Sequence, residues 1–179
     1  MDALHAGLRL HLWNGELVRL WAVIGPGLAW QSASAGGFDV FLVKLGHALG
    51  QPLKGATFGD ASDQRALSLA VDAAGNVAIA GPSIGAVDFG GGAVATTGHG
   101  AFLAKLDGQL VHRWSRGFSD VNGSLDGDVA TLLGYRALAA LPTGDLAWTT
   151  GFSQITDLGG GMLDSGSGSN DVLVALFAP

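Results

Sequence analysis

The sequence contains no cysteine, and it is poor in charged residues and in proline. Without cysteine the chain forms neither disulfides nor thiolate metal sites. Only 13% of its 179 residues are charged and five are proline. The nine Lys and Arg residues are scattered and the net charge is −6. No nucleic-acid partner is expected, because phosphate binding needs clustered basic side chains. No stretch of about 18 apolar residues lacks charges and breakers, so no membrane span is expected.

Glycine and apolar residues are abundant instead. Thirty residues are glycine and 48% of the chain is hydrophobic. Each interior glycine costs a helix about 1 kcal/mol relative to alanine, whereas tight turns use glycine readily. Val, Ile, Phe and Trp residues lie between the glycine clusters, which favours strands. The composition and the length therefore predict one all-β domain.

An internal repeat organises this domain. Residues 67–81 (LSLAVDAAGNVAIAG) return as residues 137–151 (ALAALPTGDLAWTTG). VDFGGG at 87–92 returns 69 positions later as TDLGGG. FDVFLVKL at 38–45 returns as GAFLAKLD at 100–107 and again as NDVLVALF at 170–177. Several independent matches at nearly one spacing indicate a repeat architecture.

Each copy is predicted to form four short antiparallel strands. In the second copy these are expected at about 67–72, 76–81, 101–106 and 110–118, with turns at Gly75 and at Asp107-Gly108. In the third of these strands Phe102, Ala104 and Leu106 face one side and Lys105 the other.

The first 35 residues are interpreted as a diverged first copy. Asn14-Gly15 is flanked by alternating apolar residues, and this is a strong signal for a two-residue hairpin turn. The run of residues 20–30 after Arg19, followed by Ala33-Ser34-Ala35, also allows a secretory signal peptide as an alternative interpretation.

A four-stranded antiparallel unit repeated in this way is typical of a β-propeller blade. The sequence thus predicts a partial β-propeller: a single repeat domain with blades at about 7–60, 67–120 and 135–179, the last lacking its fourth strand. Closed propellers have about four to eight blades, so this chain is expected to leave blade faces and a strand edge exposed. Self-association through those faces is the expected consequence.

The segments FDVFLVKL, FGDASDQRALSLAVDAAGNVAIAG and VDFGGG resemble the SBBP-type β-propeller repeat of bacterial secreted and cell-surface proteins. The second copy carries the resemblance most fully, whereas the third has Leu176 in place of the lysine. The resemblance implies a non-catalytic structural or protein- or glycan-binding module with an extracellular tendency. It brings no shared catalytic residue and no cofactor. A fragment of a larger propeller protein without a function of its own is the alternative.

One motif points to catalysis instead. Residues 81–85 (GPSIG) fit the G-x-S-x-G pattern, which in hydrolases places a nucleophilic serine, here Ser83, on a strand–turn–helix elbow. No helix signal follows, which favours a strand running into the Gly-rich connection. The glycine triplets at 90–92 and 159–161 lack the lysine and the helix of a phosphate-binding loop.

One further motif suggests a metal. Asp120, Asn122, Ser124 and Asp126 alternate, as oxygen ligands do in calcium loops. Leu125 occupies the position where such a loop needs glycine, so a solvated polar loop is the alternative.

Overall fold

The structure is a computed structural model, and it describes residues 10–13, 16–21, 39–45, 52–119, 121, 137–153, 155–166 and 170–179. Every regular element among these residues is a β-strand, and all strand pairs are antiparallel. None of these residues forms a helix that could cross a bilayer. The all-β prediction is confirmed.

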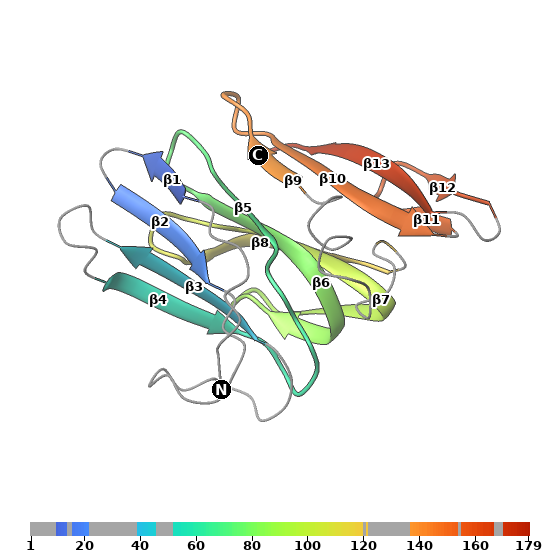
Figure 1. The fold of residues 1–179 in the computed structure, drawn as a ribbon, viewed down its shortest axis with the longest axis horizontal. Coiled ribbons are helices and arrows are strands. Elements are labelled where there is room, and N and C mark those ends of the chain that lie inside the picture. The colour runs from blue at the N-terminus through green and yellow to red at the C-terminus, as the bar shows by residue number, and fades with distance from the viewer. Residues whose placement is uncertain are drawn as a thin grey trace, which may run out of the picture.

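Three sheets follow one another along the chain, and one small hairpin is inserted between two strands of the third (Figure 1). The first sheet has the order β1-β2-β3-β4, with strands Leu10–Trp13, Glu16–Trp21, Val40–Leu45 and Pro52–Phe58. The second has the order β5-β6-β7-β8, with strands Ser68–Val71, Val77–Asp88, Ala93–Leu106 and His112–Phe118. The third has the order β9-β10-β13, with strands Ala137–Ala140, Leu146–Ser153 and Asn170–Phe177. Ile155–Asp157 and Met162–Asp164 form the hairpin β11–β12.

The four strands predicted for the second copy are all present, and the middle two are longer than expected. β6 and β7 continue through the Gly-rich connection and stay paired as far as Asp88 and Ala93. Asp88 Oδ1 accepts hydrogen bonds from Gly90 N at 2.7 Å and Gly92 N at 3.1 Å. The glycine triplet is thus the tip of one long hairpin, and two of its amides are occupied by the Asp88 carboxylate rather than open to an anion.

Two hydrogen-bond patterns of the second sheet recur later in the chain. In the β11–β12 hairpin, Asp157 Oδ1 accepts from Gly159 N at 2.7 Å and Gly161 N at 3.1 Å, as Asp88 does 69 positions earlier. The β5–β6 and β9–β10 turns also share one pattern, because Gly75 N and Gly144 N each donate to the carbonyl three residues before them.

The turn between β7 and β8 differs from its prediction. The residue with a left-handed backbone is Leu110, with φ of 59°, rather than Gly108. Asp107 Oδ1 accepts hydrogen bonds from Gln109 N at 2.8 Å and from Val111 N at 2.9 Å. The turn therefore extends from Asp107 to Val111. A left-handed leucine costs about 1–2 kcal/mol, and burial of the Leu110 side chain in the core offsets this cost.

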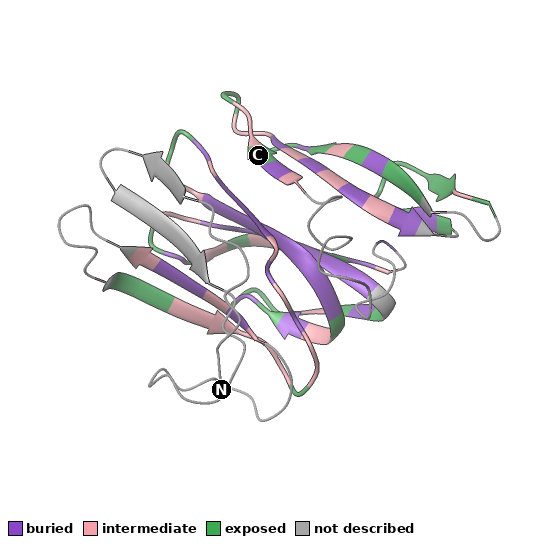
Figure 2. Cartoon of the chain, viewed as in Figure 1, coloured by how far each residue is buried: buried purple, intermediate pink, exposed green. Residues whose placement is uncertain are grey.

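The second sheet lies between the other two and is buried on both faces (Figure 2). Strand alternation sends Phe102, Ala104 and Leu106 into a core shared with the first sheet. Ala101 and Leu103 point the other way, into a core shared with the third sheet. Lys105 follows Leu103 on this face, opposite to Phe102 as predicted, and it is buried. Both faces of β5 and of the first half of β6 are therefore covered, whereas β8 at the edge is partly exposed.

The two cores differ in the size of their side chains. Toward the first sheet the second sheet presents large residues such as Ile79 and Phe102. Toward the third sheet it presents mainly alanines, and opposite them the third sheet places Trp148 and Phe177. Small residues on one side make room for aromatic residues on the other, which keeps the interior densely packed. The fourth-strand residue Phe118 joins this group at 5.4 Å from Trp148 and 5.9 Å from Phe177, measured between ring centroids.

Candidate binding surfaces

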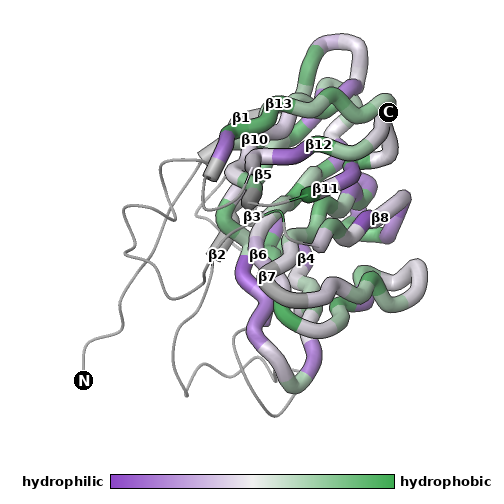
Figure 3. The backbone as a smooth tube through the Cα atoms, turned by 90° about the vertical axis from the view of Figure 1, so that its right-hand side faces the viewer, coloured by the Kyte–Doolittle hydropathy of each residue, from purple (hydrophilic) through white to green (hydrophobic). Residues whose placement is uncertain are grey.

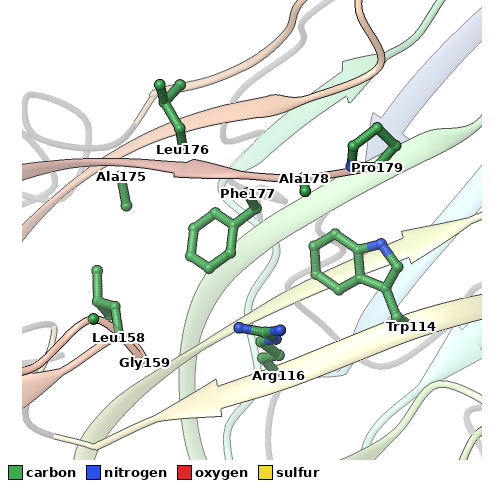
Figure 4. A pocket seen from close by; sticks show the side chains of 10 residues that line it. Trp114, Arg116, Leu158, Gly159, Ala175, Leu176, Phe177, Ala178 and Pro179 are labelled. Atoms are coloured by element: carbon green, nitrogen blue, oxygen red, sulfur yellow. The ribbon is translucent and has the colours of Figure 1, made fainter.

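A groove of about 610 Å³ lies between β8 of the second sheet and β13 of the third (Figure 4). Trp114 and Arg116 reach into it from β8, and Ala175 and Phe177 face them from β13. The tip of the β11–β12 hairpin closes one end and Pro179 lies at the other. This volume falls within the range of about 300–1,000 Å³ that is typical of ligand sites.

The groove has an aromatic and cationic lining. The Trp114 and Phe177 rings lie 6.3 Å apart, and the Arg116 guanidinium carbon lies 5.9 Å from the centre of the Phe177 ring. The other lining residues are aliphatic, glycine or proline. Among the described lining residues, no side chain is a carboxylate, imidazole, hydroxyl or thiol. None of the motifs considered from the sequence predicted this groove. Trp114 and Arg116 alternate along β8 and share one face of the strand, and this pattern could have indicated the groove.

A second surface is the outer face of the third sheet. Val172, Val174 and Leu176 of β13 are 56%, 75% and 70% exposed. Their equivalents in the second sheet, Ala101, Leu103 and Lys105, are all buried against the third sheet. Figure 3 shows the hydrophobic colouring of β13. The third sheet thus exposes the face that its two predecessors bury.

A buried ion pair of the second sheet is also hydrogen-bonded to the third sheet. Lys105 Nζ lies 3.1 Å from Asp72 Oδ2, with both side chains about 5% exposed or less, and it also donates to Gly144 O at 3.0 Å. Asn76 adds hydrogen bonds to Asp72 from its backbone and its side chain. Burial tends to raise the pKa of Asp72, but the hydrogen bonds from Asn76 and Lys105 outweigh it and hold the pKa below its usual value. All of these groups satisfy one another, so the pair is a structural connection.

The structure places Ser83 inside a strand and away from solvent. The residue is 0% exposed on β6, where it pairs with Gly100, and residues 81–119 contain strands and turns only. Within the described part of the chain its hydroxyl has no hydrogen-bond partner. A nucleophile elbow needs an exposed serine followed by a helix, and neither condition is met around Ser83.

The proposed calcium ligands Asp120, Asn122, Ser124 and Asp126 lie outside the described residues. The corresponding loop of the first copy is described and is centred on Asp60.

The Asp60 carboxylate accepts hydrogen bonds from Ser62 N at 2.7 Å, Gln64 Nε2 at 2.7 Å and Ala86 N at 3.0 Å. Burial tends to raise the pKa of Asp60, but these bonds outweigh it and lower the pKa. Internal donors therefore occupy this carboxylate. Across the described residues, no three His, Asp or Glu side chains gather into a metal-binding group.

The run of residues 20–30 considered as a signal peptide is described only in part. Leu20 and Trp21 belong to β2 and pair with Leu42 and Phe41 of β3. The remainder of the run and Ala33-Ser34-Ala35 lie outside the described residues. The predicted hairpin is confirmed in its strands, because Trp13 of β1 pairs with Glu16 of β2.

Comparison with known proteins adds no assignment, because neither a protein-family model nor a curated protein sequence matches the chain.

Proposed function

We propose that this chain is a set of β-propeller blades that acts as a non-catalytic interaction module. Each complete sheet is a four-stranded meander, and the sheets stack face to face in chain order. The first strands of the sheets are neighbours, since β5 contacts both β1 and β9. A propeller has this arrangement, with the first strand of every blade nearest the axis. The resemblance to SBBP-type repeats supports the same assignment and a secreted or cell-surface setting.

The surface that we propose for binding is the exposed outer face of the third sheet. Leu103 is 0% exposed because the third sheet covers it, whereas its equivalent Val174 is 75% exposed. In the first sheet Leu42 is likewise 0% exposed, covered by the second sheet. The same strand position is buried twice by the next sheet in the stack. The third sheet therefore has a surface suited to a further sheet of the same kind.

We assign this surface to a second copy of the chain. Two copies supply about six blades, which lies within the range of closed rings. Leu176 supports an apolar contact, because it replaces the lysine that bridges the preceding sheets and leaves no charge to be buried at this position. Burying these three side chains removes a contiguous apolar stripe from water. Loops of such an assembly then remain available to a protein or glycan partner.

Light scattering after size-exclusion chromatography tests this assignment. We expect a discrete dimer of twice 18.1 kDa, and a monomer for the Val174→Glu variant, in which a charge enters the contact. Val111→Glu is the matched control, because Val111 is 54% exposed and lies before β8, away from this face. Circular dichroism checks that both variants keep their strands. A wild-type monomer at all concentrations, or a dimer that withstands Val174→Glu, overturns the proposal.

A further inference from the structure

The groove between β8 and β13 lies where the other two sheets have a strand. In the first sheet β4 pairs with the outer edge of β3, and in the second β8 pairs with the outer edge of β7. The equivalent strand of the third sheet is β13, and no strand in the described part of the chain pairs with its outer edge. An unpaired edge presents backbone donors and acceptors to a further strand.

The two existing pairs define how such a strand would be placed. Phe58 is opposite Val40, and Phe118 is opposite Ala101, so the fourth strands enter in the same register. Both pairs also contain an irregularity directly after the shared lysine, Lys44 or Lys105. Two independent copies with one register and one irregularity form a template that can be transferred to β13.

The template also specifies the side chains of the added strand. Residues opposite one another in an antiparallel pair share a face of the sheet. Ala175 and Phe177 of β13 face the second sheet (Figure 4), and strand alternation puts the buried Leu173 on the same face. In β8 the residues opposite the equivalents of Leu173 and Ala175 are Gly117 and Ser115, and in β4 they are Thr57 and Gly55. Small residues therefore occupy the two positions that would face Trp114 and Arg116.

We infer that the groove is a docking site for one extended strand of another polypeptide, which pairs antiparallel with the free edge of β13. The strand has small residues at alternate positions, facing Trp114 and Arg116. Backbone pairing supplies affinity in this mode of recognition, and the pockets for alternate side chains supply specificity. The site uses the face of the third sheet opposite to Val174, so it does not depend on the dimer contact proposed above.

A peptide with the sequence of residues 51–60 (QPLKGATFGD) is the probe, because it contains the fourth strand of the first sheet with little net charge. We expect saturable binding of the labelled peptide by fluorescence anisotropy. We also expect slower amide exchange in residues 170–177 of the protein when the peptide is bound. A peptide of the same composition in scrambled order is the control for non-specific association.

Two matched peptide variants test the register. Thr57→Trp in the peptide puts a large side chain on the face toward Trp114, and we expect binding about tenfold weaker. Ala56→Trp puts the same side chain on the opposite face, and we expect a change within about threefold. Equal effects of the two substitutions overturn the proposed pairing.

Protein variants test the site itself. Gly160 lines the groove, and a Cβ built there meets no atom within 4 Å. Gly160→Phe is therefore expected to obstruct the groove and to weaken binding about tenfold, whereas Gln109→Phe in an exposed turn leaves it unchanged. Val174→Glu should retain binding within about threefold, which separates this site from the dimer contact. Absence of saturable binding, or binding unaffected by Gly160→Phe, overturns the inference.

Discussion

Replacing Lys105 with methionine tests what the buried ion pair contributes to the stacked sheets. Methionine keeps most of the length of the side chain but removes the ammonium group, which lies 3.1 Å from Asp72 and 3.0 Å from the Gly144 carbonyl oxygen. The change leaves the Asp72 carboxylate buried without its cation and the carbonyl of the third sheet without its donor. We expect the free energy of unfolding to fall.

The size of this loss of stability depends on the hydrogen bonds that Asp72 keeps in the variant. Removing one partner of a buried pair costs about 3–5 kcal/mol. Asp72 keeps three donors, namely the backbone amides of Ala74 and Asn76 and the Asn76 side chain. These bonds still stabilise the carboxylate, so the expected loss is smaller than this range, about 2–3 kcal/mol.

Urea unfolding followed by circular dichroism measures this loss. Lys54→Met is the matched control, because Lys54 is exposed on β4 and its removal should change stability by less than about 0.5 kcal/mol. A double-mutant cycle with Asp72→Asn should give a coupling energy of at least about 1 kcal/mol. Additive single effects, or a Lys105→Met variant as stable as the wild type, would refute the reasoning.

Three further perturbations probe other parts of the stack. In Gly81→Ala the new Cβ would clash with the Arg65 carbonyl oxygen, so the backbone must shift and urea unfolding should show a loss of about 2–3 kcal/mol. Trp148→Ala removes a ring that is 1% exposed between the second and third sheets, and calorimetry should show a loss of about 3–5 kcal/mol. Because the folded-state pKa of Asp72 is lowered, the unfolded state takes up its proton first, and stability falls as the pH drops from about 4 through the folded pKa. Asp72→Asn should abolish this part of the acid dependence in urea titrations between about pH 2 and 6.

Each of these expectations has a result that contradicts it. Gly160→Ala, at a position with no neighbour within 4 Å, should leave the unfolding midpoint unchanged, and an equal loss at positions 81 and 160 would argue against the clash. A Trp148→Ala loss below about 1 kcal/mol would mean that the aromatic core contributes little to the stack. Identical acid slopes in the wild type and the Asp72→Asn variant would show that this carboxyl is not the titrating group.

Local signals in the sequence predicted the strands well. Alternation places Phe102, Ala104 and Leu106 on one face in both the prediction and the structure. Gly75 has φ of 82° in the predicted turn, because glycine adopts this conformation without a steric cost. These features depend on residues close together in the chain, so the pattern alone was sufficient to find them.

Turn details depended on interactions that the pattern did not show. Gly108 was the expected turn residue, yet Leu110 takes the left-handed conformation because Asp107 binds the amides around it and the core buries its side chain. Likewise, the Gly-rich connection is a hairpin tip because Asp88 accepts hydrogen bonds from two of its amides. A competition between side-chain and backbone hydrogen bonds settled both cases.

The sequence by itself determined the β class and the four strands of the second sheet, because periodicity, turn residues and propensity are local properties of the chain. Only the tertiary structure decided which faces are covered. It placed Lys105 in a buried ion pair, left Val174 exposed at the equivalent of a buried position, and formed the groove beside Trp114. Burial depends on which sheet packs against which, and that is settled by contacts between residues far apart in the chain.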